Sequence, residues 1–155
     1  MIKKSVISLI SYDAAYLPRS IRTYYDYVDE IILGLDESRI TWSGNPFSFD
    51  ESALYQELKE IDRDNKISII EHNFHSSKVA LENDNFERNY LKSQCSHDWI
   101  FSIDADEELV NAKDFFLKYV PLAERYRKKI DLSFTWFLPY KEFEDCYLMI
   151  ANKIG

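Results

Sequence analysis

The chain has 155 residues, 46% hydrophobic and 15% aromatic, which suits one folded domain and argues against disorder. Its 27 acidic residues exceed its 19 Lys and Arg, and the formal charge of -8 argues against nucleic acid and anionic membrane surfaces as partners. No stretch approaches the roughly 20 apolar residues of a membrane span, and the apolar run after Lys4 is too short for a signal peptide. Cys95 and Cys146 match no disulfide framework or metal motif, so we expect free thiols and a cytoplasmic protein.

The start of the chain has the pattern of a β-α-β unit. Residues 5–10 are β-branched and apolar, as in a buried strand. Apolar residues at helical spacing then predict an amphipathic helix, which begins near Tyr16 because Pro18 is tolerated only in a first turn. A second strand over residues 31–35 ends at Asp36. Such units are almost always right-handed, with parallel strands.

The middle of the chain repeats this alternation. Residues 39–49 form a loop around a Gly-Asn-Pro turn. Residues 48–51 (S-F-D-E) have the form of a capping box and predict the start of a second helix, with Ser48 as its cap. The buried face of that helix would carry Leu54, Leu58 and Ile61. A third strand over residues 67–71 and a third helix over residues 81–94 follow.

A fourth strand carries the main functional signal. Residues 99–103 form a short apolar run, which is typical of a buried central strand in a parallel sheet. Asp104 and Asp106 follow at i and i+2 and can point to the same side. Two carboxylates this close repel each other unless a proton or cation neutralises them, and Mg²⁺ or Mn²⁺ prefers such oxygen ligands. Ligands bind at the carboxyl ends of strands in open α/β sheets, but acidic clusters there are also typical of solvated turns and helix caps.

The last third of the chain predicts one more helix and one more strand. Asn111 and Asp114 can cap a helix that Pro121 should kink or split. Its inward residues would be Phe115, Phe116, Tyr119 and Ala123. Residues 132–138 (L-S-F-T-W-F-L) predict a fifth strand. The alternation throughout predicts an α/β fold, a Rossmann-like three-layer sandwich around a mostly parallel sheet, as one domain over residues 1–155.

Two segments, in this order, resemble family 2 glycosyltransferases with the GT-A fold. Residues 87–109 (E-R-N-Y-L-K-S-Q-C-S-H-D-W-I-F-S-I-D-A-D-E-E-L) resemble the family's core, in which an Arg-Asn pair on a helix precedes the D-x-D strand. Residues 5–38 resemble the family's first β-α-β unit. The two matches together span residues 5–110, about two-thirds of the chain.

The resemblance implies an inverting glycosyltransferase that moves a sugar from a nucleotide-diphospho-sugar donor to an acceptor hydroxyl. It also implies a divalent metal, Mn²⁺ or Mg²⁺, at the D-x-D motif. Asp106 matches the aspartate that holds the metal against the diphosphate. Asp104 matches the aspartate nearer the ribose and is a second candidate metal ligand.

The resemblance further implies four nucleotide-binding residues besides Asp104. Ser11 and Tyr12 match the turn where the base stacks, and an aromatic face suits a nucleobase. Asp36 matches the acidic residue that accepts a hydrogen bond from base or ribose. Arg88 matches the helix arginine near base and phosphate. Simpler interpretations remain open: Tyr12 as a cover of the core, Asp36 as a turn former, and Arg88 as half of a surface ion pair.

The later part of the chain departs from the family. A long loop over residues 41–49 stands where the family has a compact acidic turn. No motif singles out the general base that inversion needs, so the catalytic residue is unassigned. GT-A domains are generally longer, so we expect either a fragment truncated at its C-terminus or a natural protein without the acceptor half. An oligomer or a missing C-terminal segment is a possible partner.

Two other functions remain in view at this point. A nucleotide-sugar-binding module without turnover would need neither base nor acceptor half. A nucleotidyltransferase would need a Gly- and Lys/Arg-rich loop after the first strand, and residues 11–15 (S-Y-D-A-A) are not such a loop. The sugar, the base and the acceptor (a glycan, a lipid or a protein) stay open.

Overall fold

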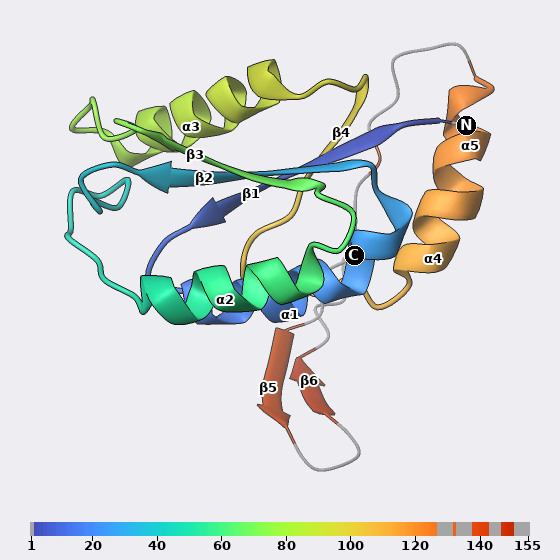
Figure 1. Cartoon of the computed structure of the whole chain (residues 1–155), viewed down its shortest axis with the longest axis horizontal. Helices are drawn as coiled ribbons and strands as arrows, with labels where there is room; N and C mark the ends of the chain where they lie inside the picture. The colour runs from blue at the N-terminus through green and yellow to red at the C-terminus, as the bar shows by residue number, and fades with distance from the viewer. Residues whose placement is uncertain (1, 127–131, 133–137, 143–146, 151–155) are drawn as a thin grey trace. The chain divides into compact units, whose positions relative to one another are not determined.

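A computed structural model describes residues 2–126, 132, 138–142 and 147–150, in two compact units, residues 1–125 and 126–155. The first unit holds a four-stranded sheet in the order β3-β2-β1-β4, with all strands parallel (Figure 1). The strands are β1 (Lys4–Ile10), β2 (Glu30–Asp36), β3 (Ile67–His72) and β4 (Trp99–Ser102). The predicted α/β class and the parallel pairing of these strands are confirmed.

Helices cover both faces of this sheet. Figure 1 shows α1 (Leu17–Tyr24) and α2 (Glu51–Ile61) on one face and α3 (Ala80–Gln94) on the other. A 3-10 turn, Ala14–Tyr16, leads into α1, and Pro18 lies in the first turn of the helix as predicted. The unit is therefore a three-layer sandwich of the Rossmann-like kind.

The core lies on both faces of β1 and β2. Every residue of β1 is buried, because the strand has a neighbour on each side and helices above and below it. Ile7 and Leu9 pack with Phe74 and Leu91 on the face that α3 covers. Burying each side chain of this size contributes about 1.5–3 kcal/mol, which explains why strands buried on both faces appear as unbroken apolar runs.

The strand register brings three loops to one edge of the sheet. Ile10 lies beside Leu35 of β2, and Ile7 lies beside Ser102 of β4. The residues after β1, β2 and β4 therefore emerge together at the carboxyl edge. All the candidate site residues except Arg88 follow one of these strands or end it.

The start of α2 differs from the prediction. The cap is Asp50, whose Oδ1 accepts a hydrogen bond from the Ala53 backbone N–H at 2.9 Å, and Ser48 lies outside the helix. Both residues are good caps. Starting the helix after Asp50 still buries Leu54, Leu58 and Ile61 as predicted.

The position of β4 also differs. Within the described sheet β4 is an edge strand, where the sequence predicted a central one. Trp99 and Ile100 are accordingly half-buried, and only Phe101 is buried within the strand. Phe101 packs edge-on against Phe116, with ring centroids 5.1 Å apart. The apolar residues of β4 therefore serve this aromatic contact as well as burial in the sheet.

The helical segment after the acidic turn contains the predicted irregularity. It consists of α4 (Ala112–Asp114), a π-helical turn (Phe115–Tyr119) and α5 (Val120–Glu124). Pro121 has no N–H to donate to the carbonyl four residues earlier, which fits a π turn just before it. Phe116 and Ala123 are buried as predicted, but Tyr119 is exposed, so its predicted inward direction is wrong. The wider π turn rotates Tyr119 off the buried face.

The second unit contains a two-stranded antiparallel sheet of β5 (Leu138–Glu142) and β6 (Tyr147–Ile150). Most of the predicted fifth strand, residues 133–137, lies outside the described residues. Within the part of the chain that the structure describes, no helix has the length and apolar character needed to cross a membrane.

Candidate functional site

In the turn after β4, buried apolar side chains alternate with aspartates that are more exposed to solvent. Ile103 and Ala105 are both 1% exposed and fix the turn to the core, while Asp104 is half-buried and Asp106 is exposed. The Ile103 N–H donates to the Ile7 carbonyl at 3.1 Å, which continues the pairing with β1. Asp104 and Glu107 then close a turn through two hydrogen bonds, Glu107 N–H to Asp104 O at 3.1 Å and Asp104 N–H to Glu107 Oε2 at 2.9 Å.

A third aspartate, which the sequence analysis did not single out, belongs to this group. Burial raises the pKa of the Asp13 carboxyl, and the nearby charges of Asp106 and Asp104 raise it further. One of its oxygens, Oδ1, is buried without a hydrogen-bond partner. Burial and the same two aspartates also raise the pKa of Glu107. We call Asp13, Asp104, Asp106 and Glu107 the acidic cluster.

Arg88 reaches the acidic cluster from α3. Its Nη2 lies 2.9 Å from Asp104 Oδ1, and its Nη1 donates to Ser102 Oγ at 2.5 Å. Its Nε donates to Asp84 Oδ1 at 2.6 Å, one helical turn earlier. Burial lowers the pKa of Arg88, but the charges of Asp104 and Asp84 raise it above its usual range. Arg88 therefore neutralises part of the acidic cluster in this structure.

The loop after β2 is tied to α3 through Trp42. Trp42 Nε1 donates to Glu87 Oε2 at 2.7 Å, and its backbone carbonyl accepts from Asn83 Nδ2 at 2.9 Å. The Arg88 guanidinium lies 5.4 Å from the centroid of the indole ring, within cation–π range. Glu87 is 5% exposed, and burial raises the pKa of its carboxyl to about 7 even though the Trp42 hydrogen bond lowers it.

Asp36 has its oxygens directed into the protein. Oδ1 accepts from the backbone N–H groups of Ser38 and Ile40 at 3.0 and 3.1 Å. Oδ2 accepts from those of Phe74 and His75 at 2.8 and 3.2 Å. Four hydrogen bonds fill the lone-pair sites of a carboxylate. Asp36 thus joins the loops after β2 and β3, and its predicted contact with base or ribose gains no support from this geometry.

The turn after β1 presents an aromatic side chain to solvent. Tyr12 is 75% exposed, so it does not cover the core. The Ser11 carbonyl accepts from the Ala14 N–H at 3.1 Å, which sets the turn that carries Tyr12 and Asp13. The charge of Asp106 acts on Asp13, so this turn and the turn after β4 lie close to one another.

The acidic cluster has the chemistry for a hard cation that is held by few protein ligands. The unpartnered Asp13 Oδ1 and the mutual repulsion of the carboxylates both favour bound positive charge. Among the described residues, however, no three His, Cys, Asp or Glu side chains converge as a ligand set. The residues therefore fit an ion held by one or two carboxylates, with water and phosphate as its other ligands, as Mg²⁺ is commonly held.

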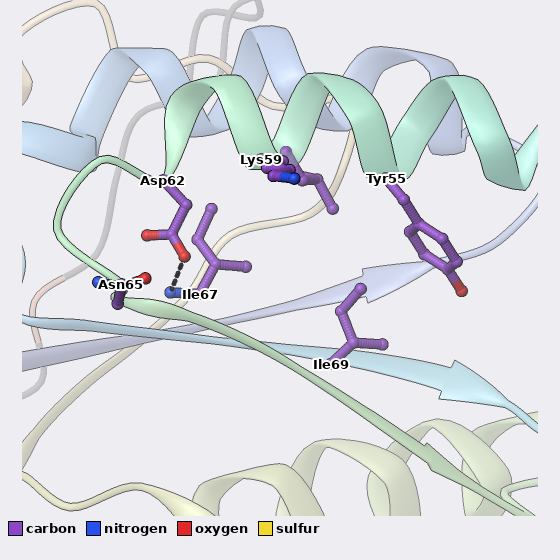
Figure 2. A pocket seen from close by; sticks show the side chains of 7 residues that line it. Tyr55, Lys59, Asp62, Asn65, Ile67 and Ile69 are labelled. Carbon is purple, nitrogen blue, oxygen red and sulfur yellow. Dashed lines mark hydrogen bonds between the residues drawn. The ribbon is translucent and has the colours of Figure 1, made fainter.

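Two hollows in the described surface lie away from this edge. One, of about 260 Å³, lies between α2 and β3 and is lined by residues such as Tyr55, Lys59 and Ile69 (Figure 2). The other, of about 370 Å³, is lined by Arg22, Tyr25 and Asp26 together with residues at the end of α2. Neither is lined by a residue of the acidic cluster.

The fold and this edge define the class of protein: an α/β domain whose parallel sheet carries acidic residues at the carboxyl ends of β1 and β4. Scanning the chain against protein-family models gives no match, and searching the curated proteins gives none either.

Proposed function

We propose that the chain binds a nucleotide diphosphate at the carboxyl edge of β1 and β4, as the donor domain of a glycosyltransferase. The observation that carries the proposal is that the charges of Asp106 and Asp104 raise the pKa of Asp13, which lies in the same turn as the exposed Tyr12. An anionic pyrophosphate approaches such carboxylates only with a cation between them. The sequence resemblance to family 2 glycosyltransferases supports the sugar-linked donor over a free nucleotide.

In this proposal, different residues contact the base, the metal ion and the phosphates of the ligand. Tyr12 offers a face on which a base can stack, and Ser11 lies at the start of the same turn. Asp104 and Asp106 hold Mn²⁺ or Mg²⁺, which when bound supplies positive charge to the departing diphosphate. Arg88 presents a guanidinium, the side chain best matched to two phosphate oxygens at once. In that role Arg88 exchanges part of its contact with Asp104 for the phosphate.

A binding module without turnover is the second candidate. The specific observation that favours it is the ion pair between Arg88 and Asp104, because this pair already satisfies part of the charge that a metal would neutralise. The general base and the acceptor remain unassigned in both candidates. A transferase releases nucleotide from a nucleotide-sugar, whereas a binding module does not, so the same sample can distinguish the two candidates.

A thermal-shift panel with UDP, GDP, dTDP and CMP, each with and without Mn²⁺, tests the proposal. A ligand at about 100 times its dissociation constant stabilises the protein by about 2.7 kcal/mol. We expect such a shift for a diphosphate with Mn²⁺ and none for CMP. Adding the matching nucleotide-sugar then separates the candidates: sustained release of nucleotide supports the transferase, and binding without release supports the module. No metal-dependent shift with any diphosphate contradicts both.

We also propose a cytoplasmic location, on the two cysteines and their spacing. Cys95 is a free thiol, and burial raises its pKa to about 11, so the thiolate that oxidants attack is scarce at neutral pH. A maleimide that cannot cross membranes should modify neither cysteine in intact cells and should react with them only after lysis, if the protein resides in a reducing interior. Finding the native protein with both cysteines oxidised would contradict this location.

A further inference from the structure

The Arg88 guanidinium makes three polar contacts of unequal quality. Its Nε donates to Asp84 Oδ1 at 2.6 Å, and its Nη1 donates to Ser102 Oγ at 2.5 Å. Its Nη2 lies 2.9 Å from Asp104 Oδ1, but this buried oxygen accepts no hydrogen bond from any residue that the structure describes. A polar atom that is buried without a hydrogen bond is under-satisfied. The contact with Asp104 thus depends on charge without a hydrogen bond, and it is the easiest of the three to exchange.

Asp84 holds Arg88 independently of Asp104. Asp84 and Arg88 lie one helical turn apart on α3, at the i,i+4 spacing where oppositely charged side chains meet. Only 23% of the Asp84 side chain and 21% of the Arg88 side chain are exposed, so water weakens this pair less than it weakens a pair on the open surface. The bond uses Nε and leaves the two terminal nitrogens of the guanidinium available to other partners.

Trp42 covers one face of the same guanidinium. Arg88 Cζ lies 5.4 Å from the centroid of the indole ring, within cation–π range. The ring is itself fixed to the buried face of α3, because Trp42 Nε1 donates to Glu87 Oε2 and the Trp42 carbonyl accepts from Asn83 Nδ2. Both of these partners are buried. Trp42 therefore has anchors of its own and does not depend on the contact between Arg88 and Asp104.

Arg88 and a divalent cation compete for Asp104. A cation bound to Asp104 would bring two positive charges close to the guanidinium, and like charges at such distances repel each other. In the free protein Arg88 therefore opposes the binding of a metal ion. A diphosphate removes this opposition, because its oxygens offer the guanidinium a new anionic partner while they also bind the metal. Metal and diphosphate should thus bind together better than either binds alone.

We propose that Arg88 is a displaceable counter-ion that makes metal binding depend on the diphosphate, and that Asp84 and Trp42 are the positioning residues that hold Arg88 during the exchange. Without ligand, Arg88 occupies Asp104 and keeps metal affinity low. With both ligands bound, Arg88 gives up Asp104 for phosphate, while Asp84 still holds Nε and Trp42 still covers the guanidinium. This inference rests on the proposed function of the carboxyl edge and adds the regulation of that site.

Mn²⁺ titrations followed by electron paramagnetic resonance, without and with UDP or GDP, test the counter-ion. Arg88→Met keeps the length of the side chain and removes its charge, so it should bind Mn²⁺ alone at least about 5-fold more tightly than the parent chain. The further gain from diphosphate should shrink by at least about 5-fold, because no counter-ion is left to displace. Arg63→Met is the matched control, because Arg63 also pairs with a carboxylate, Asp26, and lies over an aromatic ring, that of Tyr25. Arg63 lines the hollow away from the carboxyl edge, so this variant should bind Mn²⁺ as the parent does.

Double-mutant cycles test the two positioning residues. Trp42→Leu and Asp84→Ala should each weaken diphosphate binding at saturating Mn²⁺ by at least about 3-fold. Trp42→Phe keeps a ring face and Asp84→Asn keeps an acceptor for Nε, so each should recover most of the loss. Because both residues act through Arg88, Trp42→Leu and Asp84→Ala should cause no further loss in the Arg88→Met chain, whereas a purely structural role would still weaken binding there. Circular dichroism confirms that each variant is folded.

The outcomes distinguish this inference from the proposed function. A parent chain whose Mn²⁺ binding is not tightened by diphosphate contradicts the proposed function and the inference with it. If diphosphate does tighten it, Mn²⁺ affinity in Arg88→Met that is no higher than in the parent overturns the counter-ion alone, and so does an equal gain in Arg63→Met. Losses from Trp42→Leu or Asp84→Ala that persist in the Arg88→Met chain overturn the positioning roles. A gain confined to Arg88→Met, with losses that vanish in that chain, supports the inference.

Discussion

The loop after β2 and the turn after β4 both carry aspartates at the carboxyl edge of the sheet, yet their charges are used differently. Asp36 accepts four backbone hydrogen bonds inside the protein. Asp106 is exposed, and the Asp13 carboxyl near it has an oxygen with no partner. In the loop after β2, backbone N–H groups of the protein satisfy the charge of the aspartate. In the turn after β4, the carboxylate charge remains available to a ligand. Mutations should therefore affect stability in the first region and binding in the second.

The largest effect is expected for Asp36→Ala. The substitution leaves four N–H groups without their acceptor, and the N–H of the buried Phe74 has no access to water. We expect a loss of about 3–4 kcal/mol of unfolding free energy, measured by urea denaturation. Asp114→Ala is the control: its ion pair with Lys118 is exposed, so it should cost no more than about 0.5 kcal/mol. Equal costs for the two variants would contradict the role of Asp36 as a loop anchor.

Glu87 should make stability depend on pH. Its pKa is about 7 in the folded protein and 4.5 without the fold, so the folded state binds the proton more tightly. The resulting stabilisation is fully present below pH 4.5 and is lost as the pH rises through about 7, by an amount on the order of 2–3 kcal/mol. Glu87→Gln keeps an acceptor for Trp42 and removes this dependence. Unfolding free energies at pH 5 and pH 8 measure it, and an unchanged difference in the variant would contradict the assignment.

Gly34→Ala should lower the unfolding free energy by about 1–2 kcal/mol, because the side chains between β2 and α3 leave no space for an added methyl group. A Cβ at this position would lie 2.7 Å from Leu91 Cδ1 and 2.8 Å from Glu87 Oε1. Both atoms end side chains that can shift, which limits the cost. The cost should shrink when Leu91→Val removes the nearer atom, and a double-mutant cycle by urea denaturation shows whether it does. A cost that stays the same in the Leu91→Val background would place the strain elsewhere.

The smallest effect on stability is expected for Asp106→Asn. The side chain is exposed, so the unfolding free energy should change by no more than about 0.5 kcal/mol. Removing its charge should nevertheless lower the pKa of Asp13, because Asp106 helps to raise it. A carboxyl titration followed by NMR measures this shift. If the pKa of Asp13 does not change in this variant, Asp106 does not interact with Asp13, and the assignment of both residues to one acidic cluster is contradicted.

Sequence patterns were sufficient for the elements that burial alone determines. The apolar run of β1 and the position of Pro18 were enough to place the first strand and the start of α1. The capping-box pattern predicted Ser48 as the cap of α2, but Asp50, an equally good cap two residues later, is the residue that caps the helix. Tyr119 was misplaced because a π turn changes the helical spacing on which the prediction relied.

The site was harder to predict because its contacts join distant parts of the chain. Asp13 was missed because its proximity to Asp106 depends on β4 lying next to β1. Local sequence patterns do not predict the order of strands in a sheet. The hydrogen bonds from Asp36 to Phe74 and His75 likewise depend on β2 pairing with β3. Arg88 was expected near phosphate, and its ion pair with Asp104 appears only once α3 is packed on the sheet.

Mn²⁺ binding measured by electron paramagnetic resonance, with and without a nucleoside diphosphate, tests the central claim most directly. The free ion gives a strong signal that is lost when the protein binds it. If the acidic cluster holds a cation that in turn holds pyrophosphate, the diphosphate should tighten Mn²⁺ binding to the parent chain at least about 10-fold, a coupling of about 1.4 kcal/mol. Asp106→Asn should abolish that coupling while the protein stays folded. Mn²⁺ affinity that is the same with and without diphosphate, or the same in both proteins, would contradict the account.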